Sequence, residues 1–338
     1  MMRQSFPIST RKITECFQYG IMTRIYRHFY RFPLFWGIIA AAAATMAIIT
    51  PFDYAIVFEL SAYDYKPLSS FMNESIFEGD RFGAGDISTF FQIAALFLYV
   101  YAWLNSQRRS RIVQCRPYFG FVVTTSLVLN VFIVHGLKFA LGRARPEMVI
   151  ENQAAFSNWY EFGALFLPLE TSVGSLPSGH TASAIIFMTI AYALAGDRYH
   201  PTGIRLFGWI IAGLSLAYAL FMTAIRCISL YHWPTDCLFS IIFGCLVIHI
   251  LYFWILQVPR QTGYIRRIRS LPPGPKFWEL KLCWHIFLAA LGVLAMLTGV
   301  RGMFIENFAV FGIILIGGII IFTGAIRSAS TREIYSRA

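Results

Sequence analysis

Residues 206–224 read LFGWIIAGLSLAYALFMTA, a run of nineteen residues without a charged side chain. An α-helix of that length covers about 28 Å, close to the thickness of the hydrocarbon core of a bilayer. The run therefore predicts a membrane-spanning helix. Similar runs recur along the chain, and eight of them are long enough to cross a bilayer. They centre on residues 34–51, 88–105, 118–137, 180–196, 205–224, 236–256, 281–300 and 307–325.

The composition supports a membrane protein. Of the 338 residues, 57% are hydrophobic and 13% are charged, whereas soluble domains have about 25% charged residues. A net charge of +11 also occurs in nucleic-acid-binding proteins, but here lysine and arginine gather in short connectors between apolar runs. That placement is typical of membrane proteins, and we expect no nucleic-acid partner. The six cysteines show no C-x-x-C spacing; Cys227 and Cys237 lie on one predicted side and could pair, although sequence does not supply the geometry.

Charge alternates from one connector to the next. The leader before the first run, residues 108–116 and residues 260–276 are basic, whereas residues 51–87 and 138–179 carry most of the acidic side chains. Basic connectors of membrane proteins face the cytoplasm. We therefore place both termini in the cytoplasm, which eight spans allow, and place four connectors on the outer side. These are residues 51–87, 138–179, 225–235 and 301–306.

The expected fold is an all-α integral membrane protein with a six-helix core and two extra C-terminal spans. The linker SLPPGP, residues 270–275, separates the core from the last pair. The predicted parts are a basic cytoplasmic leader over 1–32, the core over 33–258, a basic linker over 259–280, a helix pair over 281–326 and a cytoplasmic tail over 327–338.

Polar residues cluster at three span ends on the predicted outer side. Lys138 and Arg145 are seven apart, so on a helix they lie two turns apart on nearly one face. By itself such a pair is also typical of cations that reach for lipid headgroups. Ser178, Gly179 and His180 begin a span, and the free N–H groups of a first helical turn favour an anion. A structural helix cap explains that second cluster equally well.

The third cluster contains Arg226, His232 and Asp236. The histidine and the acid are four apart, a spacing that lets a carboxylate hold one ring nitrogen and make the other a better nucleophile. Taken together, the clusters supply three cations, two histidines, one acid and a helix N-terminus. That set suits a tetrahedral dianion. A zinc ion is a poorer fit because the cations would repel it, so we expect no metal.

The three clusters resemble the signature of the type 2 phosphatidic acid phosphatase (PAP2) superfamily. The similarity rests on Lys138-x6-Arg145-Pro146, on Pro177-Ser178-Gly179-His180 and on Arg226-x5-His232-x3-Asp236, and it extends over about residues 88–256. Ile225 stands where the family usually has a serine, which removes one hydroxyl donor. The last two spans lie outside the six-helix core of the family.

The resemblance implies a metal-independent, two-step phosphatase without cofactors. His232, oriented by Asp236, would attack phosphorus and form a phosphohistidine, and His180 would protonate the leaving oxygen. Water would then release phosphate. The phosphoryl oxygens would be held by Lys138, Arg145, Ser178, Gly179 and Arg226.

A site at the membrane edge favours a lipid phosphate or pyrophosphate as the substrate. Within the resembled family the candidates include lipid A phosphate, undecaprenyl pyrophosphate, phosphatidylglycerophosphate and phosphatidic acid, and the sequence does not choose among them. We expect a bacterial inner membrane with the site facing the periplasm; the oligomeric state is left open. The alternatives are a lipid phosphotransferase that uses the same phosphohistidine, a vanadate-dependent haloperoxidase, and a non-catalytic lipid-binding or transport protein. Aromatic residues of the connector 147–176 would either line an acyl entrance or pack on the bundle: Phe156, Trp159, Tyr160, Phe162 and Phe166.

Overall fold

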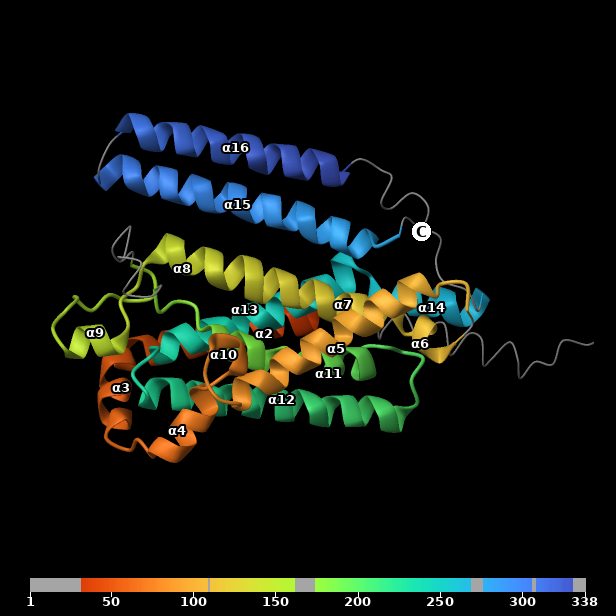
Figure 1. Ribbon diagram of the computed structural model, residues 1–338, viewed down its shortest axis with the longest axis horizontal. Helices are drawn as coiled ribbons and strands as arrows, with labels where there is room; N and C mark the ends of the chain where they lie inside the picture. Colours follow the sequence, from red (N-terminus) through yellow and green to blue (C-terminus); the bar gives the residue numbers. More distant parts are fainter. Residues whose placement is uncertain (1–31, 109, 162–173, 269–275, 306–307, 331–338) are drawn as a thin grey trace, which may run out of the picture.

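Every regular element in the described part of the chain is a helix (Figure 1). The structure, a computed structural model, describes residues 32–108, 110–161, 174–268, 276–305 and 308–330. No strand occurs among these residues, and seven helical segments are long and apolar enough to cross a membrane. The prediction of an all-α integral membrane protein is therefore confirmed. The seven segments are Pro33–Ser61, Ala84–Leu104, Arg116–Lys138, Thr202–Ile228, Pro234–Ile255, Trp278–Met303 and Val310–Ser328.

The fourth predicted span is not a single long helix. Residues 180–196 form two short helices, α10 (Gly179–Ile185) and α11 (Met188–Ala195), with a turn at Ile186 and Phe187. Together they make an apolar segment, Gly179–Ala195, that is shorter than the seven long ones. The pair packs beside α12 (Thr202–Ile228) and runs antiparallel to it. The α10–α11 pair therefore carries the chain from one end of the bundle to the other, as the predicted fourth span would.

The first span is longer than the apolar pattern predicts. Helix α2 (Pro33–Ile49) continues through the 3₁₀ turn η1 (Thr50–Phe52) into α3 (Asp53–Ser61), which turns across the end of the bundle (Figure 1). The outer connector predicted from residue 51 is therefore helical at its start. Helix α4 (Lys66–Asn73), the 3₁₀ turn η2 (Ile76–Glu78) and α9 (Pro146–Ile150) also belong to this region. We call the end formed by α3, α4, α9 and the start of α10 the cap end.

The third span carries the first polar cluster to the cap end. It consists of α7 (Arg116–Ser126), a π-helical stretch η3 (Leu127–Val134) and α8 (His135–Leu141). Gly142 follows with φ +58, a left-handed conformation that glycine adopts without strain and that ends α8. Lys138 consequently lies in the last turn of this span, just before the chain leaves the bundle.

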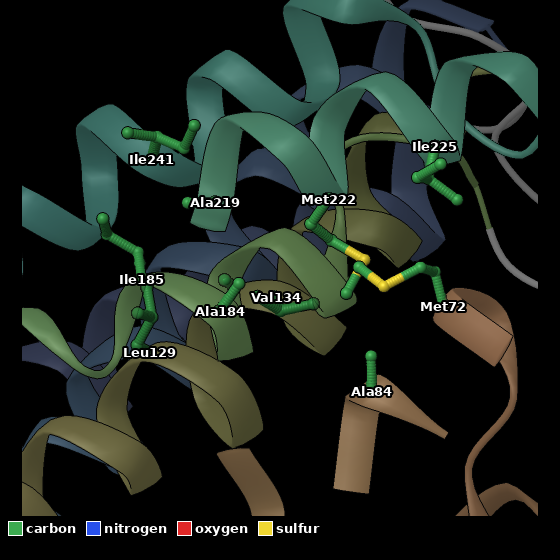
Figure 2. Packing of buried hydrophobic residues seen from close by; sticks show 11 residues of the cluster. Met72, Ala84, Leu129, Val134, Ala184, Ile185, Ala219, Met222, Ile225 and Ile241 are labelled. Carbon is green, nitrogen blue, oxygen red and sulfur yellow. The ribbon is translucent and has the colours of Figure 1, made fainter. Parts of the chain in front are cut away.

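A core of alanine, aliphatic and methionine side chains packs between the helices (Figure 2). Ala182, Ala184 and Ile185 of α10 pack against α12 and against α13 (Pro234–Ile250). Because alanine allows close helix packing in a membrane, α10 reaches the centre of the bundle. Ile225, the departure from the family pattern, is 4% exposed and packs in this core. Two further spans complete the core. The second span is α5 (Ala84–Leu104), and the sixth consists of α13 followed by the π-helical stretch η5 (Leu251–Ile255).

The last two spans form a hairpin of α15 (Trp278–Ile305) and α16 (Phe308–Ser330). A Cβ atom on Gly292 would lie 2.7 Å from the nitrogen of Phe322, so only glycine allows this close approach. Arg301 Nη1 donates to the carbonyl oxygen of Ala140 at 2.8 Å, which joins the hairpin to the end of α8. Helix α16 ends, and α2 begins, away from the cap end (Figure 1). Helices α6 (Arg111–Gln114) and α14 (Val258–Ile268) lie at that opposite end, and the leader, the SLPPGP linker and the tail beyond residue 330 are outside the described residues.

Candidate active site

One cavity of about 240 Å³ at the cap end brings the three polar clusters together. Six of the eight residues predicted to form the site line it, and Ser178 and Asp236 do not. The lining comes from η2, α5, η3, α8, the start of α9, α10, α12 and the turn before α13. The lining residues are Ser75, Glu78, Gly85, Thr89, Asn130, Val134, His135, Lys138, Arg145, Gly179, His180, Ser183, Arg226 and His232.

His232 has one defined ring orientation. Its Nδ1 atom lies 2.6 Å from the carbonyl oxygen of Ser175. A carbonyl oxygen only accepts hydrogen bonds, so Nδ1 carries the proton and Nε2 keeps its lone pair. The side chain is 1% exposed, and burial together with the positive charge of Arg226, Lys138 and Arg145 lowers the pKa of His232 well below its usual value. The lowered pKa favours the neutral ring, in which Nε2 keeps a lone pair.

The acid at position 236 takes a different place from the one expected. Its carboxylate lies 3.9 Å from Nδ1 of His232, beyond hydrogen-bond distance. Instead, Asp236 accepts a hydrogen bond from the backbone N–H of Trp233 at 2.9 Å and pairs with Arg143 at 2.6 Å. The backbone carbonyl of Ser175, not the carboxylate of Asp236, orients the histidine.

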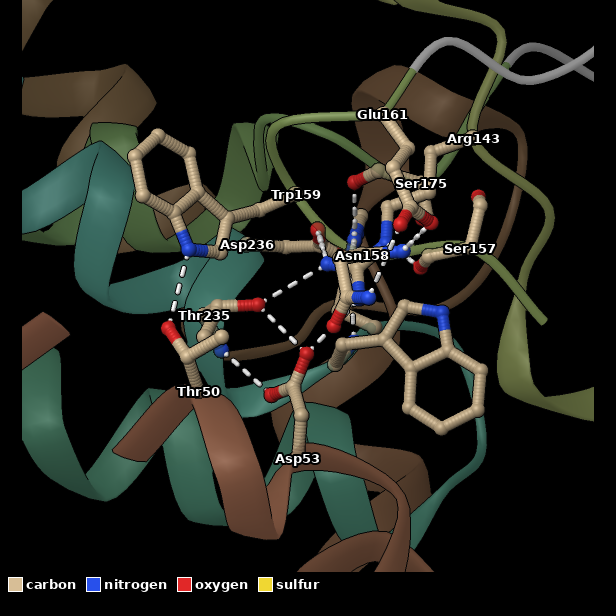
Figure 3. Close-up of polar contacts among 12 residues, drawn as sticks. Thr50, Asp53, Arg143, Ser157, Asn158, Trp159, Glu161, Ser175, Thr235 and Asp236 are labelled. Carbon is tan, nitrogen blue, oxygen red and sulfur yellow. Dashed lines mark hydrogen bonds and ion pairs between the residues drawn. The ribbon is translucent and has the colours of Figure 1, made fainter. Parts of the chain in front are cut away.

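Arg143 forms a buried charge cluster that the sequence did not reveal (Figure 3). Its side chain is 0% exposed, and its two terminal nitrogens pair with Asp236 at 2.6 Å and with Asp53 at 2.7 Å. Nη1 also donates to Thr235 at 2.9 Å, and Nε donates to the carbonyl oxygen of Ser157 at 2.9 Å. Both carboxylates and the guanidinium thereby satisfy one another away from water.

Asp53 extends this cluster to the first span. Its carboxylate accepts from the backbone N–H of Thr235 at 2.9 Å and from the Thr235 hydroxyl at 2.5 Å. These bonds fasten the start of α3 to the first turn of α13. Through Arg143, Asp53 and Asp236, the start of α3, the segment after α8 and the first turn of α13 are joined, although they are distant in sequence. His232 lies just before that turn of α13.

The three cations that line the cavity, Lys138, Arg145 and Arg226, form few contacts with acceptor groups. Arg226 Nη1 donates to Asn73 at 2.8 Å, and its guanidinium lies 4.4 Å from the centre of the Tyr231 ring. The Nε atoms of Arg145 and Arg226 are buried and have no acceptor among the described residues. Within the same part of the chain, no ion pair involves Lys138, Arg145 or Arg226. Such a cavity favours an anion with several oxygen atoms.

The start of α10 contributes its backbone and not the predicted hydroxyl. Ser178 is 0% exposed, and its oxygen accepts hydrogen bonds from the backbone N–H of Thr181 at 3.4 Å and from the Thr181 hydroxyl at 3.0 Å. Ser178 is therefore the N-cap of α10. Gly179 lines the cavity with no side chain in the way, and His180 follows it on the same wall.

Two other sequence-based possibilities have clear outcomes. Cys227 and Cys237 are free, buried thiols in hydrogen-bond contact. Phe156 packs edge-on against Trp233 at 5.0 Å, and Trp159 donates to the Thr50 hydroxyl at 2.9 Å, so these aromatic residues pack on the bundle. Phe162 and Phe166 lie outside the described residues.

The comparison with protein families now adds to the geometry. The model of the PAP2 superfamily matches residues 119–260, an interval that includes every residue of the three clusters. Over this interval the chain is similar to the PAP2 superfamily. The similarity supports phosphatase chemistry in an integral membrane protein. Searches of curated proteins and of solved structures gave no match.

The charge cluster makes the fold sensitive to the loss of Arg143. We expect Arg143→Met to lower the free energy of unfolding by about 3–5 kcal/mol, because Asp53 and Asp236 would stay buried without a cation. The loss is measured as a lower thermal midpoint in detergent, with Arg108→Met, an exposed cation at the opposite end, as the control. Equal midpoints for the two variants would contradict the structural role of the cluster.

Proposed function

We propose that the protein is a phosphatase that removes phosphate from a membrane lipid phosphate or pyrophosphate through a phosphohistidine. The observation that carries the proposal is the shared cavity of His180, His232 and the cations Lys138, Arg145 and Arg226. This set of residues binds a phosphoryl group and supplies both a nucleophile and an acid. The PAP2 match supports the same chemistry.

In the first step, Nε2 of His232 attacks phosphorus and an N–P bond forms while the P–O bond to the leaving group breaks. The electron pair of that bond leaves with the oxygen, which takes a proton from His180. Lys138, Arg145 and Arg226 hold the other phosphoryl oxygens and offset the charge of the transition state.

In the second step, water attacks the phosphohistidine. His180 takes a proton from the water, an O–P bond forms, the N–P bond breaks, and Nε2 of His232 regains its lone pair. Inorganic phosphate leaves, and the enzyme returns to its first state. The proton that Nδ1 donates to Ser175 stays in place throughout, so the ring keeps one orientation in both steps.

The position of the cavity supports a lipid substrate. Its walls come from the ends of membrane-spanning segments, including Lys138 at the end of one span and Arg226 near the end of another. A phosphate at this depth lies where the headgroup of a bilayer lipid is found. For the location we propose a bacterial inner membrane with the cap end facing the periplasm, supported by the alternation of basic and acidic connectors.

Loss of the nucleophile gives the first test. We expect His232→Ala to lower phosphate release from lipid phosphates in micelles by at least about a thousandfold, because neither step proceeds without the nitrogen. The wild type should also form an acid-labile, alkali-stable phosphoenzyme that His232→Ala lacks, with EDTA causing no loss of activity. His200→Ala, at the opposite end, is the control, and full activity in His232→Ala would exclude this nucleophile.

Transfer to a second lipid hydroxyl in place of phosphate release would assign the chain to the phosphotransferases. A panel of lipid A, undecaprenyl pyrophosphate, phosphatidylglycerophosphate and phosphatidic acid, assayed for free phosphate and for phosphorylated lipid products, separates the two activities and ranks the substrates.

The lowered pKa of His232 predicts a particular pH profile. Because the ring stays neutral when the pH falls through the usual histidine range, about 6.5, kcat/KM should not decline there once it is corrected for ionisation of the substrate. The decline should begin at lower pH, where the ring takes up a proton. A corrected profile with its acid midpoint at or above that usual value would contradict the neutral nucleophile.

The orientation can be tested with a pair of single cysteines at exposed positions. In spheroplasts we expect a membrane-impermeant maleimide to label Tyr63→Cys, at the cap end, and not Arg267→Cys, on α14 at the other end. Permeabilised membranes should label both. The reverse pattern would put the cap end in the cytoplasm.

A further inference from the structure

One acidic side chain faces the cation-rich cavity, and the two-step reaction does not yet use it. Among the described lining residues, Glu78 is the only acid. Its Oε1 atom lies 3.8 Å from Nε2 of His180. The Glu78 side chain is 59% exposed and the His180 side chain is 11% exposed, so the carboxylate reaches the cavity from its solvent side.

The backbone around Glu78 is held in place by buried contacts. Asp86 is 0% exposed and accepts hydrogen bonds from the Ser75 hydroxyl at 2.6 Å, from the Ile76 N–H at 3.0 Å and from the Gly83 N–H at 2.9 Å. A Cβ atom on Gly83 would lie 2.1 Å from the carbonyl oxygen of Glu74, so the loop closes only with glycine there. The turn that ends at Glu78 is thus a built part of the site.

The surroundings of His180 oppose the state that its role requires. An acid must carry a proton before it can donate one, and a protonated imidazole is positively charged. His180 is nearly buried, and the titratable and charged groups that face it are Arg226 of α12, Lys138 of α8, His232 before α13, and Glu78 of η2. Arg145 and His135 line the same cavity. The backbone carbonyl of Asn73 accepts a hydrogen bond from the ring and favours its charged form. Among the charged groups named here, Glu78 is the one whose charge also favours a protonated ring.

We propose that Glu78 is a positioning residue whose negative charge keeps the ring of His180 protonated, so that it can donate its proton to the leaving oxygen. The inference rests on the proposed phosphatase function. In the first step the proton passes from Nε2 of His180 to the oxygen as the P–O bond breaks, and the neutral ring remains beside Glu78. In the second step His180 takes a proton from the attacking water, and Glu78 again faces a charged ring.

The test compares leaving groups. An alkoxide leaves only with a proton, whereas p-nitrophenolate leaves without one. The first step alone differs between the two substrates, so its rate is measured in a single turnover as release of the leaving group. For Glu78→Gln we expect this rate on dioctanoyl phosphatidic acid to fall at least about tenfold, part of the 10²–10⁴-fold that acid–base catalysis supplies. On p-nitrophenyl phosphate the same rate should change less than about twofold, because this leaving group needs no proton and the cations and His232 remain. Asp80→Asn, an exposed acid two residues further along the same loop, should match the wild type on both substrates.

Several outcomes would overturn the proposal. Equal losses on both substrates would indicate a structural role for Glu78, and equal activities of wild type and Glu78→Gln would show that His180 needs no carboxylate. Unchanged kcat with tighter inhibition by inorganic phosphate would make Glu78 a competitor for the phosphate site.

If Glu78→Gln fails to fold, Glu78→Asp and Glu78→Ala are compared in the same assay, and equal loss in both variants on both substrates counts against the proposal. A wild type that releases no phosphate from any substrate would refute the proposed function itself, whereas a wild type that turns over beside an unaffected Glu78→Gln refutes only this inference.

Discussion

The buried pairing of Arg143 with two carboxylates is the constraint on which the site depends. A guanidinium without exposure is tolerated only where anions meet it, and here Asp53 and Asp236 meet it from two different spans. The cluster therefore requires the start of α3, the end of the third span and the first turn of α13 to come together. His232 lies just before that turn, so the position of this histidine follows from the same pairing.

Two layers of charged residues with different roles surround the cavity. The outer layer consists of Arg143, Asp53 and Asp236, and it binds protein elements to one another. The inner layer consists of Lys138, Arg145 and Arg226, which lack carboxylate partners among the described residues and so keep their charge for a ligand. Keeping the acids out of the inner layer preserves its attraction for anions, and Glu78, at the solvent side, is the exception.

Hydropathy and charge predicted the spans well because the free-energy cost of exposing polar groups to lipid is the largest contribution to where a segment lies in the membrane. The sequence also predicted that Lys138, His180, Arg226 and His232 lie close together, and the four line one cavity. Each is a polar residue at the end of an apolar run, where polar residues are few. The partners of Arg143 were not predictable in this way: it lies 90 residues from Asp53 and 93 from Asp236, and no local pattern encodes such a pairing. The i,i+4 spacing of His232 and Asp236 misled for a related reason, because a competing cation took the carboxylate. The turn at Ile186 and Phe187 was not predicted because no proline or glycine marks it in the sequence. Glu78 was not predicted to face the cavity because its connector contains several other acids.

The hydrogen bond from His232 to Ser175 ends on a main-chain oxygen. Every amino acid carries that oxygen, so the identity of residue 175 matters for this bond only through the path of the backbone. Substituting the side chain of residue 175 leaves this acceptor in place, so mutagenesis at that position does not detect the hydrogen bond. The orientation of the histidine is consequently robust to mutation at that position but exposed to any change that shifts the chain leading into α10. A single ester linkage in place of the peptide bond, which weakens the carbonyl as an acceptor, is the kind of alteration to which such an arrangement responds.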